Sequence, residues 1–185
     1  MIEVELKVRA GNLARVERAL DSFGARVLLV EEQRDIYYTL PHRDFWATDE
    51  ALRLRLSSHR GSSTEECYLT YKGPKLDEVS KSREELTVRV EGWEDARRLL
   101  QSLDFAEVGQ VSKLRKTYRL GEFLISLDQV DKLGQFVEIE AQAIGGYDQL
   151  LKRAFGLLEK LGFRQEESIR ESYLELLKEA ERPGG

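Results

Sequence analysis

Several segments of this chain alternate charged and aliphatic residues with a strict period of two, and this alternation constrains the fold more than any other feature. In the first ten residues, Glu3, Glu5, Lys7 and Arg9 alternate with aliphatic side chains. Successive side chains of a β-strand point to opposite faces, so the pattern predicts a strand with one charged and one aliphatic face. One such strand is typical of any half-exposed antiparallel sheet. The fold is constrained because the same alternating pattern recurs in several segments of the chain.

At least six predicted strands carry charges on one face. Most are separated by glycine, proline or other turn signals, and Gly73-Pro74 is expected to end one of them. Residues 25–40 are rich in β-branched and aromatic residues and predict one long strand or two consecutive strands, whereas the polar stretch 76–82 predicts an irregular segment. The alternating segments are 2–9, 51–59, 66–75, 83–90, 111–120, 123–134 and 135–143.

Four amphipathic helices are predicted from apolar residues at helical spacing, over residues 13–23, 93–103, about 147–161 and about 167–181. About eight strands with four helices indicate an α+β fold built on an antiparallel sheet, curled or closed, with helices outside. If the helices cover the aliphatic face, the charged faces must turn toward one another. We therefore expect an eight-stranded barrel with a charged lumen. The alternative is a flat sheet whose charged face is solvated.

Composition limits the class of protein. The length of 185 residues suits one domain, 1–185, with helices 147–181 packed on the barrel exterior. A single cysteine, Cys67, makes no internal disulfide, so we expect a cytoplasmic protein. No apolar run reaches the roughly 20 residues needed to span a bilayer. The formal net charge of -5 argues against nonspecific nucleic-acid binding. The sequence thus predicts no membrane and no nucleic-acid partner.

The charges on the predicted lumen face separate by sign along the chain. Arg53, Arg55, Lys113 and Arg115 form basic segments, whereas the segments after residue 122 carry carboxylates. Guanidinium and ammonium groups bind phosphate oxygens, and carboxylates hold hard cations such as Mg²⁺ or Mn²⁺. This separation predicts a site for a polyphosphate bound together with a divalent metal.

Seven short motifs, in this order, resemble the CYTH domain family, the triphosphate tunnel metalloenzymes. The resemblance covers nearly the whole chain and is strongest to the class IV adenylyl cyclase branch; thiamine triphosphatases and inorganic triphosphatases belong to the same family. The motifs are Glu3-x-Glu5-x-Lys7, Arg53-x-Arg55, Lys72 in TYKGPK, Arg83-x-Glu85, Lys113-x-Arg115, Asp128 in SLDQV and Glu138-x-Glu140.

The resemblance implies an eight-stranded tunnel that binds ATP, thiamine triphosphate or inorganic triphosphate with Mg²⁺ or Mn²⁺, in a family that often forms homodimers. It implies roles for catalysis in Lys7, Lys72 and Arg115, for substrate binding in Lys7, Arg53, Arg55, Lys72, Arg83, Lys113 and Arg115, and for metal binding in Glu3, Glu5, Asp128, Glu138 and Glu140. We expect an adenylate cyclase, with triphosphate hydrolysis or non-catalytic binding of a polyphosphate as the alternatives.

Three aromatic residues stay unassigned by the sequence. Lys72 paired with Tyr37 or Tyr38 would activate water in a triphosphatase of this family, but the sequence does not say which tyrosine faces inward. Trp46 stands beside Phe45 in a predicted loop. It either stacks a base at the mouth of the tunnel or anchors the loop by packing.

Overall fold

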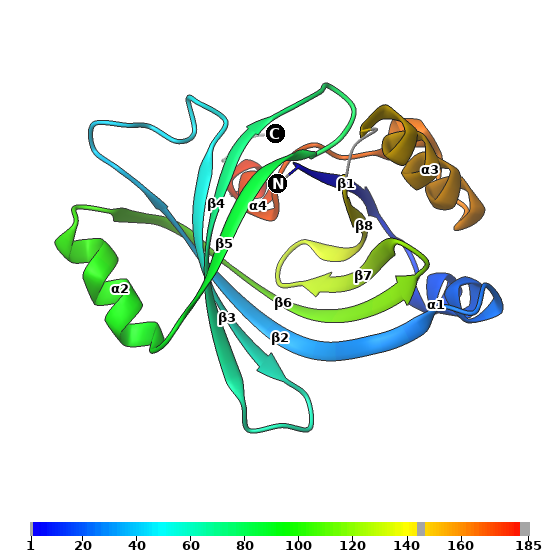
Figure 1. Ribbon diagram of the computed structural model, residues 1–185, viewed down its shortest axis with the longest axis horizontal. Helices are drawn as coiled ribbons and strands as arrows, with labels where there is room; N and C mark the ends of the chain where they lie inside the picture. The colour runs from blue at the N-terminus through cyan, green and yellow to red at the C-terminus, as the bar shows by residue number, and fades with distance from the viewer. Residues whose placement is uncertain (1, 144–146, 182–185) are drawn as a thin grey trace.

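The computed structural model describes residues 2–143 and 147–181, and within them eight antiparallel strands close into a barrel (Figure 1). The order around the barrel is β1-β5-β4-β3-β2-β6-β7-β8. The predicted closed barrel is therefore confirmed, and the flat sheet is excluded. The strands are β1 (Ile2–Arg9), β2 (Arg26–Thr39), β3 (Ala51–His59), β4 (Glu65–Lys75), β5 (Arg83–Val90), β6 (Ala106–Leu120), β7 (Phe123–Val130) and β8 (Gly134–Gln142).

The strand β1 is paired unequally with its two neighbours. Along β8 it is in register from Glu3 opposite Gln142 to Arg9 opposite Phe136, whereas with β5 the register covers only Ile2 opposite Glu84 and Glu3 opposite Arg83. The segment before β5 continues this seam: the backbone N–H of Lys81 donates to the carbonyl of Glu5 at 2.9 Å. A loop thus lies along β1 where strand pairing stops.

The aliphatic faces of the strands point outward and are covered by helices. Val4, Leu6 and Val8 are fully buried in a cluster that includes residues of α1 (Leu13–Ser22) and α3 (Tyr147–Lys160). The helix α2 (Trp93–Ser102) packs over β3 in a second cluster, on the opposite side of the barrel from α1 and α3 (Figure 1). With the apolar faces packed under helices, the alternate residues of each strand face the lumen. No helix among residues 2–143 and 147–181 is long and apolar enough to cross a membrane.

The last helix, α4 (Tyr173–Ala180), reaches the lumen. The Tyr173 ring lies 4.3 Å from Nζ of Lys7 and 5.0 Å from Nζ of Lys113, and its hydroxyl donates to Asp128 at 2.8 Å. Tyr173 also packs edge-on against Phe136 of β8, with ring centres 5.0 Å apart. The sequence prediction placed this helix on the barrel exterior, and a helix packed only there would not make these contacts with lumen residues.

The course of β4 and the start of the last helix differ from the sequence prediction. The strand β4 passes through Pro74 to Lys75, with a register irregularity between Lys72 and Lys75 that accommodates the missing N–H of proline. Residues 26–39 form one strand, β2, which agrees with the first of the two alternatives predicted for residues 25–40. Instead of one helix over 167–181, a short 3-10 turn (Gln165–Glu167) precedes an extended segment, and α4 begins after Ser172 because the side chain of Ser172 accepts from the backbone N–H of Glu175.

Candidate functional site

The barrel encloses a cavity of about 740 Å³ lined by charged side chains from β1, β3, β4, β5, β6 and β8. The predicted site residues that line it are Glu3, Glu5, Arg53, Arg55, Lys72, Arg83, Lys113, Arg115, Glu138 and Glu140. Lys7 and Asp128 are absent from the lining. The structure thus brings together ten of the twelve residues that the sequence singled out.

Three carboxylates of the cavity form a cluster. Glu5, Glu138 and Glu140 each offer an oxygen within 4.8 Å of the others, and Glu5 stands opposite Glu140 in the β1–β8 register. Burial raises the pKa of Glu140 to about 7, with Glu138 and Glu5 adding to the shift and Arg115 opposing it. Three converging carboxylate oxygens fit a hard divalent cation such as Mg²⁺ or Mn²⁺.

Glu3 and Asp128, the two other predicted metal ligands, lie outside this cluster. Burial raises the pKa of Glu3 to about 9, and the negative charge of Glu140 adds to the shift. Asp128 is fully buried and accepts from Nε of Arg115 at 2.7 Å, from Nη2 of the same residue at 2.5 Å and from the hydroxyl of Tyr173 at 2.8 Å. In this geometry the oxygens of Asp128 bind protein donors.

Arg115 connects the carboxylate cluster to Asp128. Besides its two bonds to Asp128, its Nη2 donates to Glu138 and its Nη1 lies 3.5 Å from Glu140. Burial alone would raise the pKa of Glu138, but Lys81 and Arg115 hold it well below the ordinary value. Arg115 therefore positions carboxylates from β7 and β8, so its donors are largely committed within the protein.

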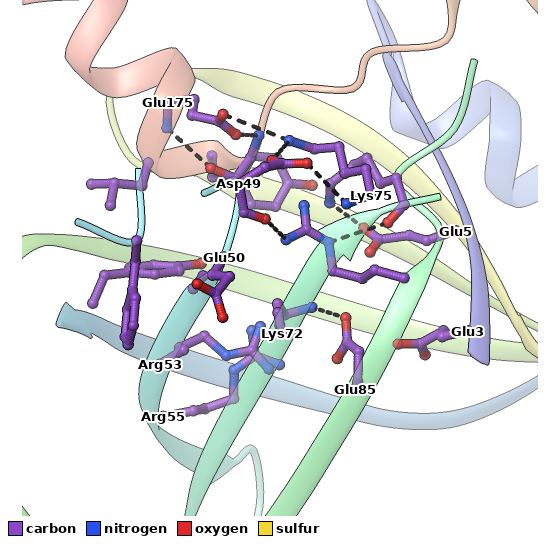
Figure 2. Close-up of a pocket in the computed structure, with 18 of the residues that line it drawn as sticks. Glu3, Glu5, Asp49, Glu50, Arg53, Arg55, Lys72, Lys75, Glu85 and Glu175 are labelled. Carbon is purple, nitrogen blue, oxygen red and sulfur yellow. Dashed lines mark hydrogen bonds and ion pairs between the residues drawn. The ribbon is translucent and has the colours of Figure 1, made fainter. Parts of the chain in front are cut away.

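The other cations differ in how many of their donors are already bound. Arg55 donates to Asp35 through Nε at 2.6 Å and Nη2 at 2.7 Å. Nε of Arg53 is buried and has no hydrogen-bond partner among the described residues. Lys72 forms an ion pair with Glu85, beside Arg53 and Arg55 and opposite Glu3 (Figure 2). The Nε group of Arg53 is thus a donor available to an anion in the cavity.

Lys113 is a buried ammonium group close to two guanidinium groups. Its Nζ lies 3.5 Å from Oδ2 of Asp35. Burial lowers the pKa of Lys113 to about 8, and the positive charges of Arg55 and Arg115 contribute to the shift, while Asp35 opposes it. An anion bound in the cavity would favour the protonated form.

Lys7 lies beneath the Tyr173 ring, fully buried, and its ammonium group donates to the backbone carbonyl of Glu171. Burial and the positive charge of Lys81 lower its pKa well below the ordinary value. The structure therefore separates Lys7 from the cavity by an aromatic side chain.

Lys81 was missed by the sequence analysis. It is only 8% exposed, lines the cavity, donates to Glu5 and lies 3.4 Å from Glu138. The polar stretch that carries it has no periodicity that could have revealed this burial. It is instead held by hydrogen bonds: Ser82 accepts from the backbone N–H of Glu5 at 3.1 Å and from Ser80 at 2.7 Å.

The lumen-facing position of Asp35 and Tyr37 could have been predicted from the sequence. Glu31, Gln33, Asp35 and Tyr37 are all buried and alternate along β2, the same signal that marked the other strands. Tyr37 therefore shares the lumen face with Asp35 and lines the cavity, and burial with the charge of Asp35 raises its pKa. The neighbouring Tyr38 packs in the exterior cluster under α2.

Comparison with known proteins identifies the family of this chain. The model of the CYTH domain matches residues 1–173. The chain belongs to the CYTH family. A curated relative, "Putative adenylate cyclase MJ0240" of Methanocaldococcus jannaschii, is 38% identical over 95% of this chain and 98% of its own length. The solved structure of PH1819 protein from Pyrococcus horikoshii is also 38% identical, covers 96% of this chain and 99% of its own, and superposes with a TM-score of 0.87.

A more distant solved structure shares the fold. It is a Hippeastrum protein named "Putative adenylyl cyclase HpAC1", for which a dominant triphosphatase activity is described. The identity is 17%, the TM-score is 0.65, and the match covers 97% of this chain and 95% of the Hippeastrum chain. At this identity the likeness concerns the fold alone.

Proposed function

We propose that this protein is a metal-dependent enzyme that converts ATP into cyclic AMP and pyrophosphate in the barrel lumen. One observation carries the proposal: the cluster of Glu5, Glu138 and Glu140 faces the same cavity as Arg53, Arg55, Lys72 and Lys113. A site that only bound a polyphosphate would need the cations. The three converging carboxylates are what a catalytic divalent metal requires in addition.

The proposed roles follow from the contacts. Glu5, Glu138 and Glu140 would hold Mg²⁺ or Mn²⁺, which when bound neutralises phosphate charge and increases the acidity of a hydroxyl group. Arg53 donates through its buried, unpartnered Nε group, and Lys72 and Lys113 place ammonium groups along the same cavity. These donors stabilise the negative charge that develops on the departing pyrophosphate.

The bond changes in this reaction are limited. The ribose 3′-hydroxyl loses its proton as its oxygen attacks the α-phosphorus, the bond between the α-phosphorus and the bridging oxygen to the β-phosphate breaks, and pyrophosphate leaves and takes up a proton. The chain's part is positioning, because the reacting atoms must lie in line. Arg115 fixes the carboxylates on β7 and β8, and the loop before β5 fixes Lys81 against β1.

Hydrolysis of a triphosphate is the second candidate, because the same charges serve a water molecule aligned with the terminal phosphorus. The triphosphatase activity described for the Hippeastrum protein favours this candidate at the level of the fold. The 38% identity to the relative named "Putative adenylate cyclase MJ0240" favours cyclisation. The position of the substrate along the tunnel decides between the two reactions.

A product assay tests the proposal. The protein is incubated with ATP, thiamine triphosphate or inorganic tripolyphosphate in Mg²⁺ or Mn²⁺, and the products are resolved by chromatography. We expect cyclic AMP and pyrophosphate from ATP. Orthophosphate without a cyclic nucleotide would show that the protein is a triphosphatase, and binding without any product would show a non-catalytic module.

A further inference from the structure

The cavity is lined by apolar and aromatic side chains as well as by charged ones. Trp46, Leu174 and Val108 contribute to the lining here. Trp46 lies in loop 40–50 between β2 and β3 and is 49% exposed. A half-exposed indole that lines a cavity presents an apolar ring surface that a ligand bound there can contact.

Packing does not explain Trp46. Among the described residues it belongs to none of the three apolar clusters, whereas its neighbour Phe45 is 7% exposed and packs with Leu52 and Leu54 of β3. The residue that anchors loop 40–50 is therefore Phe45. Of the two alternatives that the sequence left open for Trp46, the anchoring role is therefore already filled by Phe45.

The loop holds Trp46 in a fixed position. The backbone N–H of Trp46 donates to Oδ1 of Asp44 at 2.9 Å, and the carbonyl of Phe45 accepts from the N–H of Glu50 at 2.8 Å. The Glu50 carboxylate accepts from Arg43 at 2.6 Å and from Thr48 at 2.5 Å. A ligand that contacts the indole would therefore cost little ordering of the chain.

The same loop is bonded to the cationic wall. Nη1 of Arg83 donates to the carbonyl of Asp49 at 3.3 Å, and Nζ of Lys75 donates to the Asp49 carboxylate at 2.6 Å. Figure 2 shows Asp49 beside Lys75, and Glu50 on the side of Arg53 and Lys72. Trp46 is thus held at a fixed offset from the cations that would bind phosphate.

The indole presents a π-face toward α4. Nζ of Lys178 lies 4.8 Å from the centre of the Trp46 ring, and both residues line the cavity. An indole that binds a cation on its face can also bind a planar aromatic group by stacking, in exchange for that cation. The cavity therefore joins a polyanion-binding wall to an aromatic surface.

We propose that Trp46 is the stacking surface for the planar aromatic group attached to the bound triphosphate. This inference rests on the proposed function and adds the determinant that selects an organic triphosphate over inorganic tripolyphosphate. The base of ATP and the heterocycles of thiamine triphosphate share the required chemistry. Inorganic tripolyphosphate lacks it.

The first test is fluorescence. The chain has two tryptophans, and Trp93 of α2 packs against the exterior cluster and is absent from the cavity lining. In a Trp93→Phe background, Trp46 is the remaining indole. With EDTA present to prevent turnover, we expect ATP or thiamine triphosphate to quench its fluorescence and tripolyphosphate to leave it nearly unchanged. Equal quenching by all three ligands would overturn the proposal.

The second test compares affinities by calorimetry under the same conditions. Trp46→Ala should weaken binding of the aromatic triphosphate about tenfold to a hundredfold, the range for loss of one base–aromatic stack, and should change tripolyphosphate binding less than about twofold. Trp46→Phe should restore most of the affinity. Unchanged ATP and thiamine triphosphate affinities in Trp46→Ala, or an equal loss for all three ligands, would refute stacking.

Comparing ATP with thiamine triphosphate identifies the source of the aromatic group, since the larger dependence on Trp46 marks the ligand that stacks there. Tripolyphosphate separates this inference from the proposed function. If wild-type protein does not bind tripolyphosphate, the triphosphate site itself is refuted and the stacking proposal with it. If tripolyphosphate binds and Trp46→Ala leaves both aromatic ligands unaffected, only the stacking proposal fails.

Discussion

The ammonium group of Lys81 lies 3.4 Å from Oε1 of Glu138 and donates to Glu5, so this lysine occupies the side of the carboxylate cluster that faces the loop before β5. Burial alone would lower the pKa of Lys81, but Glu5 and Glu138 hold it above the ordinary value. Under the proposed function, Lys81 and a divalent cation would therefore bind the same carboxylates.

We expect Lys81→Met to destabilise the protein in EDTA by about 3–5 kcal/mol, the usual cost of removing one partner of a buried ion pair. Added Mg²⁺ or Mn²⁺ should then raise the melting temperature of the variant more than that of wild type, because the cation restores the missing positive charge. Lys75→Met is the control, since Lys75 pairs with Asp49. Equal metal-induced shifts in Lys81→Met and wild type would contradict the shared site.

The carboxylates of the cluster should differ in their effect on stability. Glu140 has a pKa raised to about 7, so the folded protein stabilises its charged form less than water does, and stability falls as pH rises from about 4.5 to about 7. Glu140→Gln should therefore raise the melting temperature at pH 7.5 by about 2–4 °C, the shift for about 1 kcal/mol in a chain of this size.

Glu138→Gln should have the opposite effect, because Glu138 is the partner of Arg115 and Lys81 and its pKa is lowered. Its stabilisation is present above the ordinary pKa and is lost as pH falls through the folded pKa. Thermal unfolding of both variants at pH 7.5 measures the contrast.

Glu5→Gln and Glu140→Gln should abolish turnover with the fold intact, and EDTA-resistant activity in either would refute the metal assignment.

Substitutions of Arg53 and Arg55 should differ in effect: both should weaken anion binding, but only the substitution of Arg55 should also reduce stability markedly. Arg53→Ala should weaken tripolyphosphate binding by about 1.5–3 kcal/mol, the value for a hydrogen bond to a charged group, with little change in stability. Arg55→Ala should in addition lose about 3–5 kcal/mol of stability, because Asp35 stays buried without its bidentate partner. Calorimetry and urea unfolding of both variants test this. A loss of stability in Arg53→Ala equal to that in Arg55→Ala would contradict the assignment.

The lowered pKa of Lys113 predicts that the stability of the folded protein depends on pH. Between its folded pKa of about 8 and the ordinary value of 10.5, the unfolded chain holds a proton that the folded chain lacks, so stability rises with pH over this interval. Lys113→Met should be more stable than wild type below pH 8, and the difference should shrink as pH rises to 10. Urea unfolding across pH 7–10 measures this difference.

The affinity of wild type for tripolyphosphate should fall above pH 8, where free Lys113 loses its proton, and that of Lys113→Met should not show this fall. The pH profile of binding by calorimetry is the measurement. Parallel profiles for the two proteins would show that Lys113 does not titrate in contact with the anion.

The barrel could be predicted because alternation is a local property of the sequence, and alternate residues of a strand must face opposite sides. The lining cations Arg53, Arg55 and Lys113 were found for that reason. Lys81 was not found, because the burial of a loop residue depends on tertiary contacts that leave no periodic signal in the chain.

The role of a carboxylate also could not be predicted from alternation. Asp128 and Glu138 both face inward, yet Asp128 stands directly opposite Arg115 in the β6–β7 register and meets a guanidinium group. Glu5 and Glu140 stand opposite each other in the β1–β8 register and form part of the carboxylate cluster. Strand register decides whether an inward-facing carboxylate meets a guanidinium group or another carboxylate. The spacing of residues along the sequence does not determine this register.

The pairing of β1 with β8 has a consequence for folding kinetics. The first and last strands of the barrel form this ladder, so its contacts span nearly the whole barrel sequence and carry the largest loop-closure entropy. On a ribosome, β1 emerges first and waits for its main partner until β8 has been synthesised. Because Glu5 and Glu140 face each other across that ladder, we expect barrel closure and completion of the carboxylate cluster to occur as one late step.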